Sequence, residues 1–224
     1  MKKIYFITVL MFSSLIFSQT TIKKPLGKFS ELKVFSFLNV ELIKATTNKI
    51  EVFGKNAEDV SVTQINNALK IRLPLDKYFS KNDVFIKVYY VKINSIEVSE
   101  GAKVVLPPIK QYELELKAQE GGEIITEVDT KVLTIKSVTG GKIKASGATK
   151  SQNIKINTGG VYMGQNLKAE SSKVEIKAGG KAEINSINFI DVKILAGGVL
   201  TIHGKVNELK ESTIIGGRIF YKNQ

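Results

Sequence analysis

The chain has 224 residues, of which 43% are hydrophobic and 24% charged, with no cysteine and one histidine. This composition fits a globular core but excludes disulfides and thiolate metal sites, and one imidazole argues against a zinc site. The formal net charge of +12 raises the question of nucleic acid. Arginine supplies the bidentate contacts of such interfaces, and only Arg72 and Arg218 are present, so the composition argues against nucleic acid.

Residues 1–18 resemble a secretory signal. Lys2 and Lys3 precede an apolar stretch over residues 4–17, and Ser18 is a small residue before the expected cut, which leaves Gln19 as the new N-terminus. The stretch is shorter than the roughly 20 residues that span a bilayer, so a membrane anchor is the weaker alternative. Without cysteine the chain cannot carry an N-terminal lipid. We expect an exported protein with no membrane span after cleavage, in the periplasm, on the outer-membrane surface or secreted.

Residues 19–92 alternate between apolar and polar side chains and are rich in β-branched and aromatic residues, which predicts strands. The clearest segments are residues 31–43, 48–54, 59–65, 68–75 and 82–93. No Pro, Gly or Ser-rich linker separates them from the C-terminal two thirds of the chain. We therefore expect one domain over residues 19–224, in which residues 19–92 form irregular first coils and a cap, and residues 93–224 form regular repeats.

Glycine pairs recur through the second part of the chain. Their first members lie 19, 19, 20, 18 and 19 residues apart, and Gly101 extends the series one step toward the N-terminus. The pairs are Gly121 and Gly122, Gly140 and Gly141, Gly159 and Gly160, Gly179 and Gly180, Gly197 and Gly198, and Gly216 and Gly217. A constant period near 19 residues indicates a solenoid.

Positions around each pair repeat as well. From Gly101 to Gly197, apolar residues stand five positions before the first glycine of each corner, and every residue four positions before it is charged. Three positions after the first glycine, the residue is apolar at every corner. This charged column is Glu97, Lys117, Lys136, Lys155, Glu175 and Lys193. Because side chains alternate along a strand, the apolar columns should face the core and the charged column the solvent.

These repeats predict an all-β fold: a single-stranded, parallel, right-handed β-helix with two or three short strands per coil and structural corners at the glycines. About six regular coils fall between Gly101 and Gly216, so the repeat region should be near 29 Å long at about 4.8 Å per coil. A phosphate-binding loop or a calcium-binding β-roll would need other glycine spacings. The segment after Gly217 supplies Phe220 and Tyr221, after which the chain stops.

No residue is assigned a catalytic, cofactor-binding or metal-binding role. His203 follows Ile202 on an alternating strand, so we expect a solvated surface histidine. The densest acidic patch is Glu113, Glu115, Glu120 and Glu123, which we interpret as solvated side chains. Tyr78, Tyr89 and Tyr90 could line a sugar-binding surface, although half-buried strand positions are the more ordinary interpretation.

The stretch "VFIKVYYVKINSIEVSEGAKVVL", with the corners Ser99-Glu100-Gly101-Ala102 and Ser146-Gly147-Ala148, resembles the head GIN domain family of auto-transporter adhesin-like proteins from Bacteroidetes. The resemblance covers residues 28–224, although this chain has Gly-Gly where Ser-Gly-Ala is usual. It implies a β-helix exported to the cell envelope and offers no catalytic residues.

Two functions are consistent with these observations. The first is a non-catalytic envelope protein, an adhesin that presents a rigid solenoid face to a protein or glycan. The second is a glycan-binding or glycan-active protein of the polysaccharide-lyase type, with an acidic or tyrosine-lined groove. A homo-oligomer through the solenoid ends or faces stays open.

Overall fold

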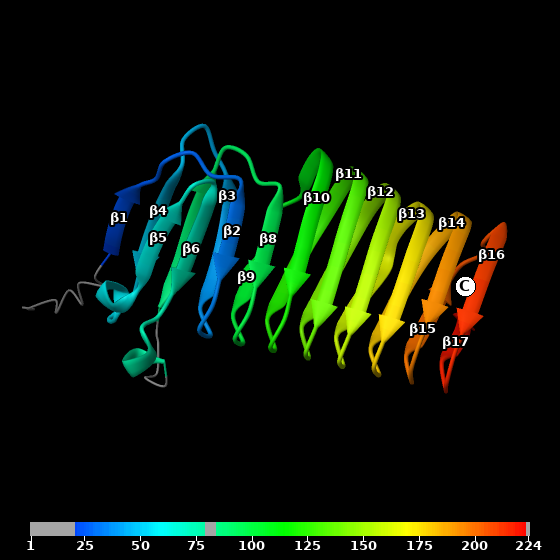
Figure 1. Ribbon diagram of the computed structural model, residues 1–224. Helices are drawn as coiled ribbons and strands as arrows, with labels where there is room; N and C mark the ends of the chain where they lie inside the picture. The colour runs from blue at the N-terminus through cyan, green and yellow to red at the C-terminus, as the bar shows by residue number, and fades with distance from the viewer. Residues whose placement is uncertain (1–20, 79–83, 223–224) are drawn as a thin grey trace, which may run out of the picture.

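The computed structural model describes residues 21–78 and 84–222, so the predicted signal lies outside the described residues. The protein is all-β and forms a solenoid of about seven turns, repeating about every 19 residues (Figure 1). The predicted β-solenoid and its period are therefore confirmed. Among the described residues, no helix is long and apolar enough to cross a membrane.

The central coils are built from five long strands that pair in parallel: β10 (Ile109–Ala118), β11 (Glu123–Val138), β12 (Lys142–Asn157), β13 (Val161–Lys177) and β14 (Lys181–Ile194). From β11 to β14, one strand of 14 to 17 residues makes nearly a whole coil and bends midway, instead of breaking into the expected two or three short strands. Each coil therefore has two flat sides, joined by a bend at one end and by the glycine corner at the other (Figure 1).

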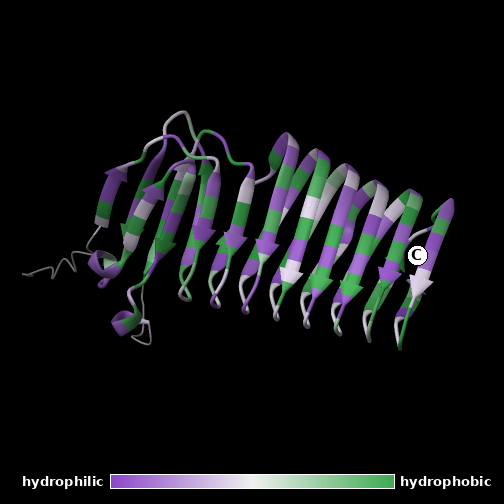
Figure 2. Ribbon diagram, in the orientation of Figure 1, coloured by the Kyte–Doolittle hydropathy of each residue, from purple (hydrophilic) through white to green (hydrophobic). Residues whose placement is uncertain are grey.

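The parallel register stacks like positions of successive coils directly on one another. Ile124 pairs with Ile143, Ile143 with Tyr162, and Tyr162 with Ala182. These side chains are buried, and so are the apolar residues five positions before each glycine pair from Ile96 to Val192. Figure 2 shows the resulting alternation of hydrophobic and hydrophilic residues along each strand. The two flat sides thus enclose one core and turn two outer faces to the solvent.

The corners are tight turns in which the two glycines meet different constraints. At the corner after β12, Thr158 and Gly159 have φ of 46° and 72°, and the Gly160 N–H donates to the Asn157 carbonyl at 3.0 Å. Positive φ at both central residues is the geometry of a type I′ turn. Gly160 does not have positive φ, but a Cβ there would lie 2.2 Å from the Ser137 carbonyl oxygen of the preceding coil. The first glycine of the pair allows the positive φ of the turn, and the second allows adjacent coils to stack closely.

The N-terminal part contains nine short strands: β1 (Thr21–Pro25), β2 (Glu31–Val34), β3 (Asn39–Lys44), β4 (Lys49–Phe53), β5 (Ser61–Ile65), β6 (Ala68–Arg72), β7 (Phe85–Tyr90), β8 (Ser95–Val98) and β9 (Lys103–Val105). Two 3₁₀ turns, η1 (Ala57–Asp59) and η2 (Leu75–Lys77), interrupt them. Their order in space differs from their order in the chain. Strand β2 lies between β6 and β8, and β3 lies between β7 and β9, so the later coil β6–β7 stacks outside the earlier coil β2–β3.

The outermost strands of this end are antiparallel. Strand β4 pairs with β1 and β7, and β5 pairs with β6. Strand β1 carries Lys23, Lys24 and Pro25 at the edge. Lysine and proline on an edge strand discourage the pairing of further strands.

The C-terminal end consists of β15 (Val199–His203) and β16 (Glu208–Thr213), which stack on β14, and of β17 (Arg218–Lys222), which stacks on β15. Here the apolar column is interrupted, because Glu211 is in register with buried Val192. Phe220 and Tyr221 are about half exposed, at 49% and 56%. A carboxylate in an inward column discourages the stacking of another coil on this end.

Candidate binding surface

The outer face formed by β2, β8 and the second halves of the long strands carries the predicted charged column. The register places each member beside the next, from Lys33 through Glu97, Lys117, Lys136, Lys155 and Glu175 to Lys193. We call this row the charge ladder. Alternation predicts its outward orientation, and the register confirms that its members stack in one line.

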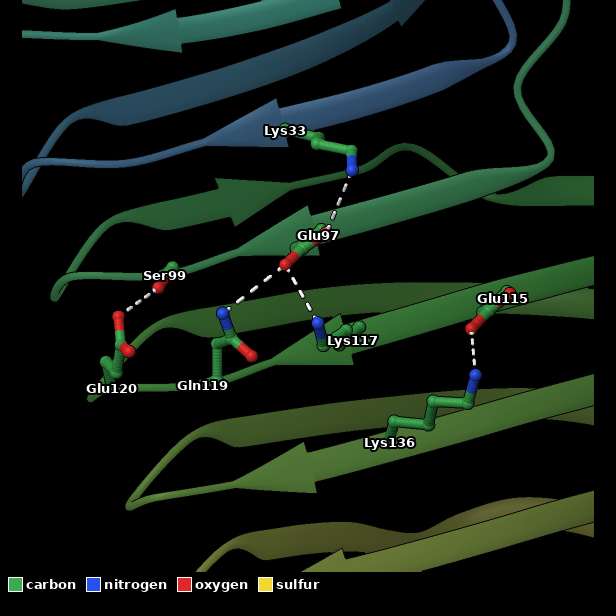
Figure 3. Close-up of polar contacts among 8 residues, drawn as sticks. All are labelled: Lys33, Glu97, Ser99, Glu115, Lys117, Gln119, Glu120 and Lys136. Atoms are coloured by element: carbon green, nitrogen blue, oxygen red, sulfur yellow. Dashed lines mark hydrogen bonds and ion pairs between the residues drawn. The ribbon is translucent and has the colours of Figure 1, made fainter. Parts of the chain in front are cut away.

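Glu97 is the acidic centre of the first part of the ladder (Figure 3). Its carboxylate lies 3.4 Å from the Lys33 ammonium and 2.9 Å from that of Lys117, and it accepts a hydrogen bond from the Gln119 amide at 3.3 Å. The side chain is only 17% exposed. Burial alone would raise the pKa of Glu97, but the hydrogen bond from Lys117 and the charges of Lys117 and Lys33 outweigh it and lower that pKa.

Two further contacts continue this pattern across neighbouring coils (Figure 3). Lys136 donates to the Glu115 carboxylate at 2.6 Å, and Ser99 donates to Glu120 at 2.6 Å near the corners. Every one of these contacts joins adjacent turns of the solenoid. They hold side chains of the first part of the face in fixed positions, which is what a preorganised binding surface requires.

Beyond Glu97 the ladder becomes cationic. Lys117, Lys136 and Lys155 occupy three successive coils with no acidic member between them. A hollow of about 210 Å³ opens at this point, lined by Lys117, Lys136, Val138, Lys155, Ile156, Asn157, Glu175 and Lys177. We call it the lysine groove.

The opposite outer face has a different character. A hollow of about 540 Å³ lies near the N-terminal end, lined by Asn39, Val40, Glu41, Val84, Phe85, Lys103 and Val105. Phe85 and Val105 are about 40% exposed there. We did not predict this hollow, although one signal was present: Val105 and Ile125 are apolar at positions where alternation calls for outward polar residues.

The acidic candidates do not form one cluster. Glu113 and Glu115 lie on β10, Glu120 lies at a corner, and Glu123 lies on the opposite face, where it pairs with Lys103 at 3.2 Å. Within residues 21–78 and 84–222, no group of three or more His, Cys, Asp or Glu side chains could hold a metal ion. The sequence places these carboxylates close together in the chain, and the solenoid separates them.

The tyrosines are separated as well. Tyr90 is buried, and Tyr89 donates a hydrogen bond to Glu51 at 3.1 Å on the outside of β7. Tyr78 follows η2 and packs edge-on against Phe37, with ring centroids 5.2 Å apart. They do not line a common sugar-binding surface.

The expected exposure of His203 is wrong. The residue is only 7% exposed, because it lies between Asn185 and Lys222 on neighbouring strands and its Nε2 is 2.8 Å from the Glu183 carboxylate. The alternation of residues predicts the side of the strand on which His203 lies. It does not predict that the Glu183 side chain of the preceding coil lies against the imidazole.

Known proteins resemble the chain along nearly its whole length. The sequence profile of the family described as "Putative auto-transporter adhesin, head GIN domain" matches residues 28–205. The chain belongs to this head GIN domain family. No curated protein matches the sequence.

Solved structures share the head GIN fold at low sequence identity. A "putative adhesin" from Bacteroides fragilis has a TM-score of 0.81 at 16% identity, with 91% of this chain and 97% of that chain covered. A "putative adhesin" from Parabacteroides merdae has a TM-score of 0.71 at 17% identity, with 91% and 96% covered. A "putative lipid binding protein" from Parabacteroides distasonis has a TM-score of 0.67 at 15% identity, with 91% and 96% covered. At these identities the likeness shows a shared fold.

Proposed function

We propose that this head GIN protein is an exported, non-catalytic adhesin that uses one outer face of its solenoid to bind a partner at the cell envelope. The observation that carries the proposal is the charge ladder, whose side chains are fixed in register by the strands and by ion pairs between coils. Such a face needs little ordering on binding, so less affinity is lost to side-chain entropy. The adhesin descriptions of the family and of two neighbours support the same function.

Export is part of the proposal and is testable by itself. The predicted signal over residues 1–18 implies a mature chain that begins at Gln19. Intact mass of the protein from fractionated cells should show this shortened species in the periplasm, on the outer membrane or in the medium. A full-length chain confined to the cytoplasm would refute export.

Binding is tested by incubating the purified mature chain with isolated cell-envelope material and with a glycan array. We expect saturable binding by the folded protein. This binding should be lost when the incubation is carried out in urea at a concentration that keeps the protein unfolded. Absence of saturable binding to any of these surfaces would contradict the adhesin function.

The second function, a glycan-active protein, has less support because Glu113, Glu115, Glu120 and Glu123 do not share one groove. Glycoside hydrolysis by paired carboxylates requires the two groups within about 10 Å across the scissile bond. A reducing-end assay on acidic and neutral polysaccharides separates the two functions, because an adhesin releases no new reducing ends.

A further inference from the structure

The lysine groove differs from the matching row of the opposite face in the order of its charges. On the opposite face the row through Lys103 continues with Glu123, Lys142, Val161 and Lys181, so no two cations are adjacent. On the face of the charge ladder, Lys117, Lys136 and Lys155 follow one another directly. Like charges opposite each other on adjacent strands destabilise a sheet, so such a run is not explained by stability.

Internal carboxylates neutralise this run only in part. Glu97 pairs with Lys117 and Glu115 pairs with Lys136, both from the N-terminal side of the run. Lys155 is exposed, and within the described part of the chain no carboxylate oxygen lies within 4.0 Å of its ammonium. Glu175 follows in the row, where it lies 2.8 Å from the Lys177 ammonium and also interacts with the charges of Lys155 and Lys193, so it offsets each of the three only in part. Positive charge is therefore left over around Lys155.

The shape of the groove limits what can neutralise that charge. The hollow is about 210 Å³, and its lining includes the apolar residues Val138 and Ile156 beside the ammonium groups. Lys117 and Lys136 line the hollow and are 33% and 40% exposed, so both stay accessible from it. A flat membrane surface would meet the rim first, whereas a single polymer chain can lie along the row.

We propose that the lysine groove binds a linear acidic polysaccharide whose carboxylate or sulfate groups align with Lys117, Lys136 and Lys155. The backbones of successive members of the row are one strand spacing apart, about 4.8 Å along the solenoid axis, which is the scale of one sugar residue. The apolar part of the lining offers contact to the apolar face of a sugar ring. This inference rests on the proposed adhesin function and names the chemical class of the partner.

The test compares two charge reversals on the same strand. Lys155→Glu alters the groove, and Lys144→Glu alters an exposed lysine of β12 on the opposite face, so both change the net charge equally. The probes are polygalacturonate, dextran sulfate, neutral dextran and vesicles of phosphatidylglycerol with phosphatidylcholine. Affinity is measured by calorimetry at low and at physiological salt.

We expect the wild-type chain to bind at least one acidic polymer and not neutral dextran, with an affinity that falls as salt rises. Lys155→Glu should weaken binding about tenfold, because it removes one attraction and adds one repulsion. Lys144→Glu should change affinity less than twofold.

Equal weakening by both variants would overturn the inference, since net charge alone would then explain binding. Binding to the vesicles without binding to either polymer would replace the polysaccharide with a lipid surface and also overturn it. Failure to bind any acidic polymer, together with saturable binding to envelope material, would refute the polysaccharide and leave the adhesin function standing. Absence of binding both to acidic polymers and to envelope material would refute the polysaccharide and the adhesin function together.

Discussion

The corner after β12 allows the stacking of coils to be tested by single substitutions. A Cβ on Gly160 would lie 2.2 Å from the Ser137 carbonyl oxygen, 2.5 Å from its carbonyl carbon and 2.8 Å from its Oγ. Ordinary contacts begin at 3.4 Å, so the two coils would have to separate by about 1 Å at this point. That shift would strain the hydrogen bond from the Val161 N–H to the Gly141 carbonyl, which is 2.9 Å long.

The expected magnitudes follow from this geometry. Gly160→Val should lower the free energy of unfolding by about 2–4 kcal/mol, since overpacking typically costs about 1–3 kcal/mol and the two methyl groups of valine add to the conflict. Gly159→Ala should cost about 1–2 kcal/mol, because φ of 72° is unfavourable for alanine but no atom lies within 4 Å of the new Cβ. Lys155→Ala, on the outer face of the same coil, should cost less than about 0.5 kcal/mol.

Urea unfolding followed by circular dichroism measures these differences as shifts of the midpoint. The order of destabilisation should be Gly160→Val, then Gly159→Ala, then Lys155→Ala. Equal midpoints for Gly160→Val and Lys155→Ala would mean that the second glycine of each pair does not set the distance between coils, and the explanation of the corners would fail.

Two further substitutions test the polar contacts. Glu97→Gln should lower stability at pH 7 by roughly 1–2 kcal/mol through loss of its charged hydrogen bonds. Because folding lowers the pKa of Glu97, the wild type should lose this advantage as the pH falls below the unfolded value near 4.5, so the two urea midpoints should approach each other as the pH is lowered from 7 through that value. A constant difference across that range would contradict the assigned role. Tyr162→Phe should cost about 1–2 kcal/mol, because the fully buried hydroxyl donates to the side-chain Oε1 of Gln152 at 2.9 Å. An unchanged thermal midpoint would show that this bond contributes nothing.

The repeat part of the fold is predictable because one rule governs every coil. Alternation assigns Ile124 and Ile143 to the core and Lys117 and Lys136 to the surface, and the constant period stacks them in register. The N-terminal part obeys no such rule. The local pattern of β6 predicts a strand, and a turn joins it to β5, with which it pairs. Nothing in that pattern shows that the other edge of β6 pairs with β2, because this pairing depends on contacts distant in sequence.

The candidate surface was predictable to the same extent. The charged column is visible in the sequence, and so is the run of three lysines within it. The burial of His203 was not, because it depends on the side chain of Glu183 in the preceding coil. The separation of Glu123 from Glu120 was missed because the corner between them turns the chain to the opposite face.

If the face of the charge ladder meets the partner, its lysines should be shielded in the complex. Lysine acetylation followed by mass spectrometry, with and without saturating envelope material, measures this shielding residue by residue. We expect protection of Lys136 and Lys155 in the bound protein, with Lys142 and Lys144 on the opposite face as reactive as in the free protein. Protection of Lys142 and Lys144 instead, or equal reactivity of all four, would show that the charge ladder is not the binding face.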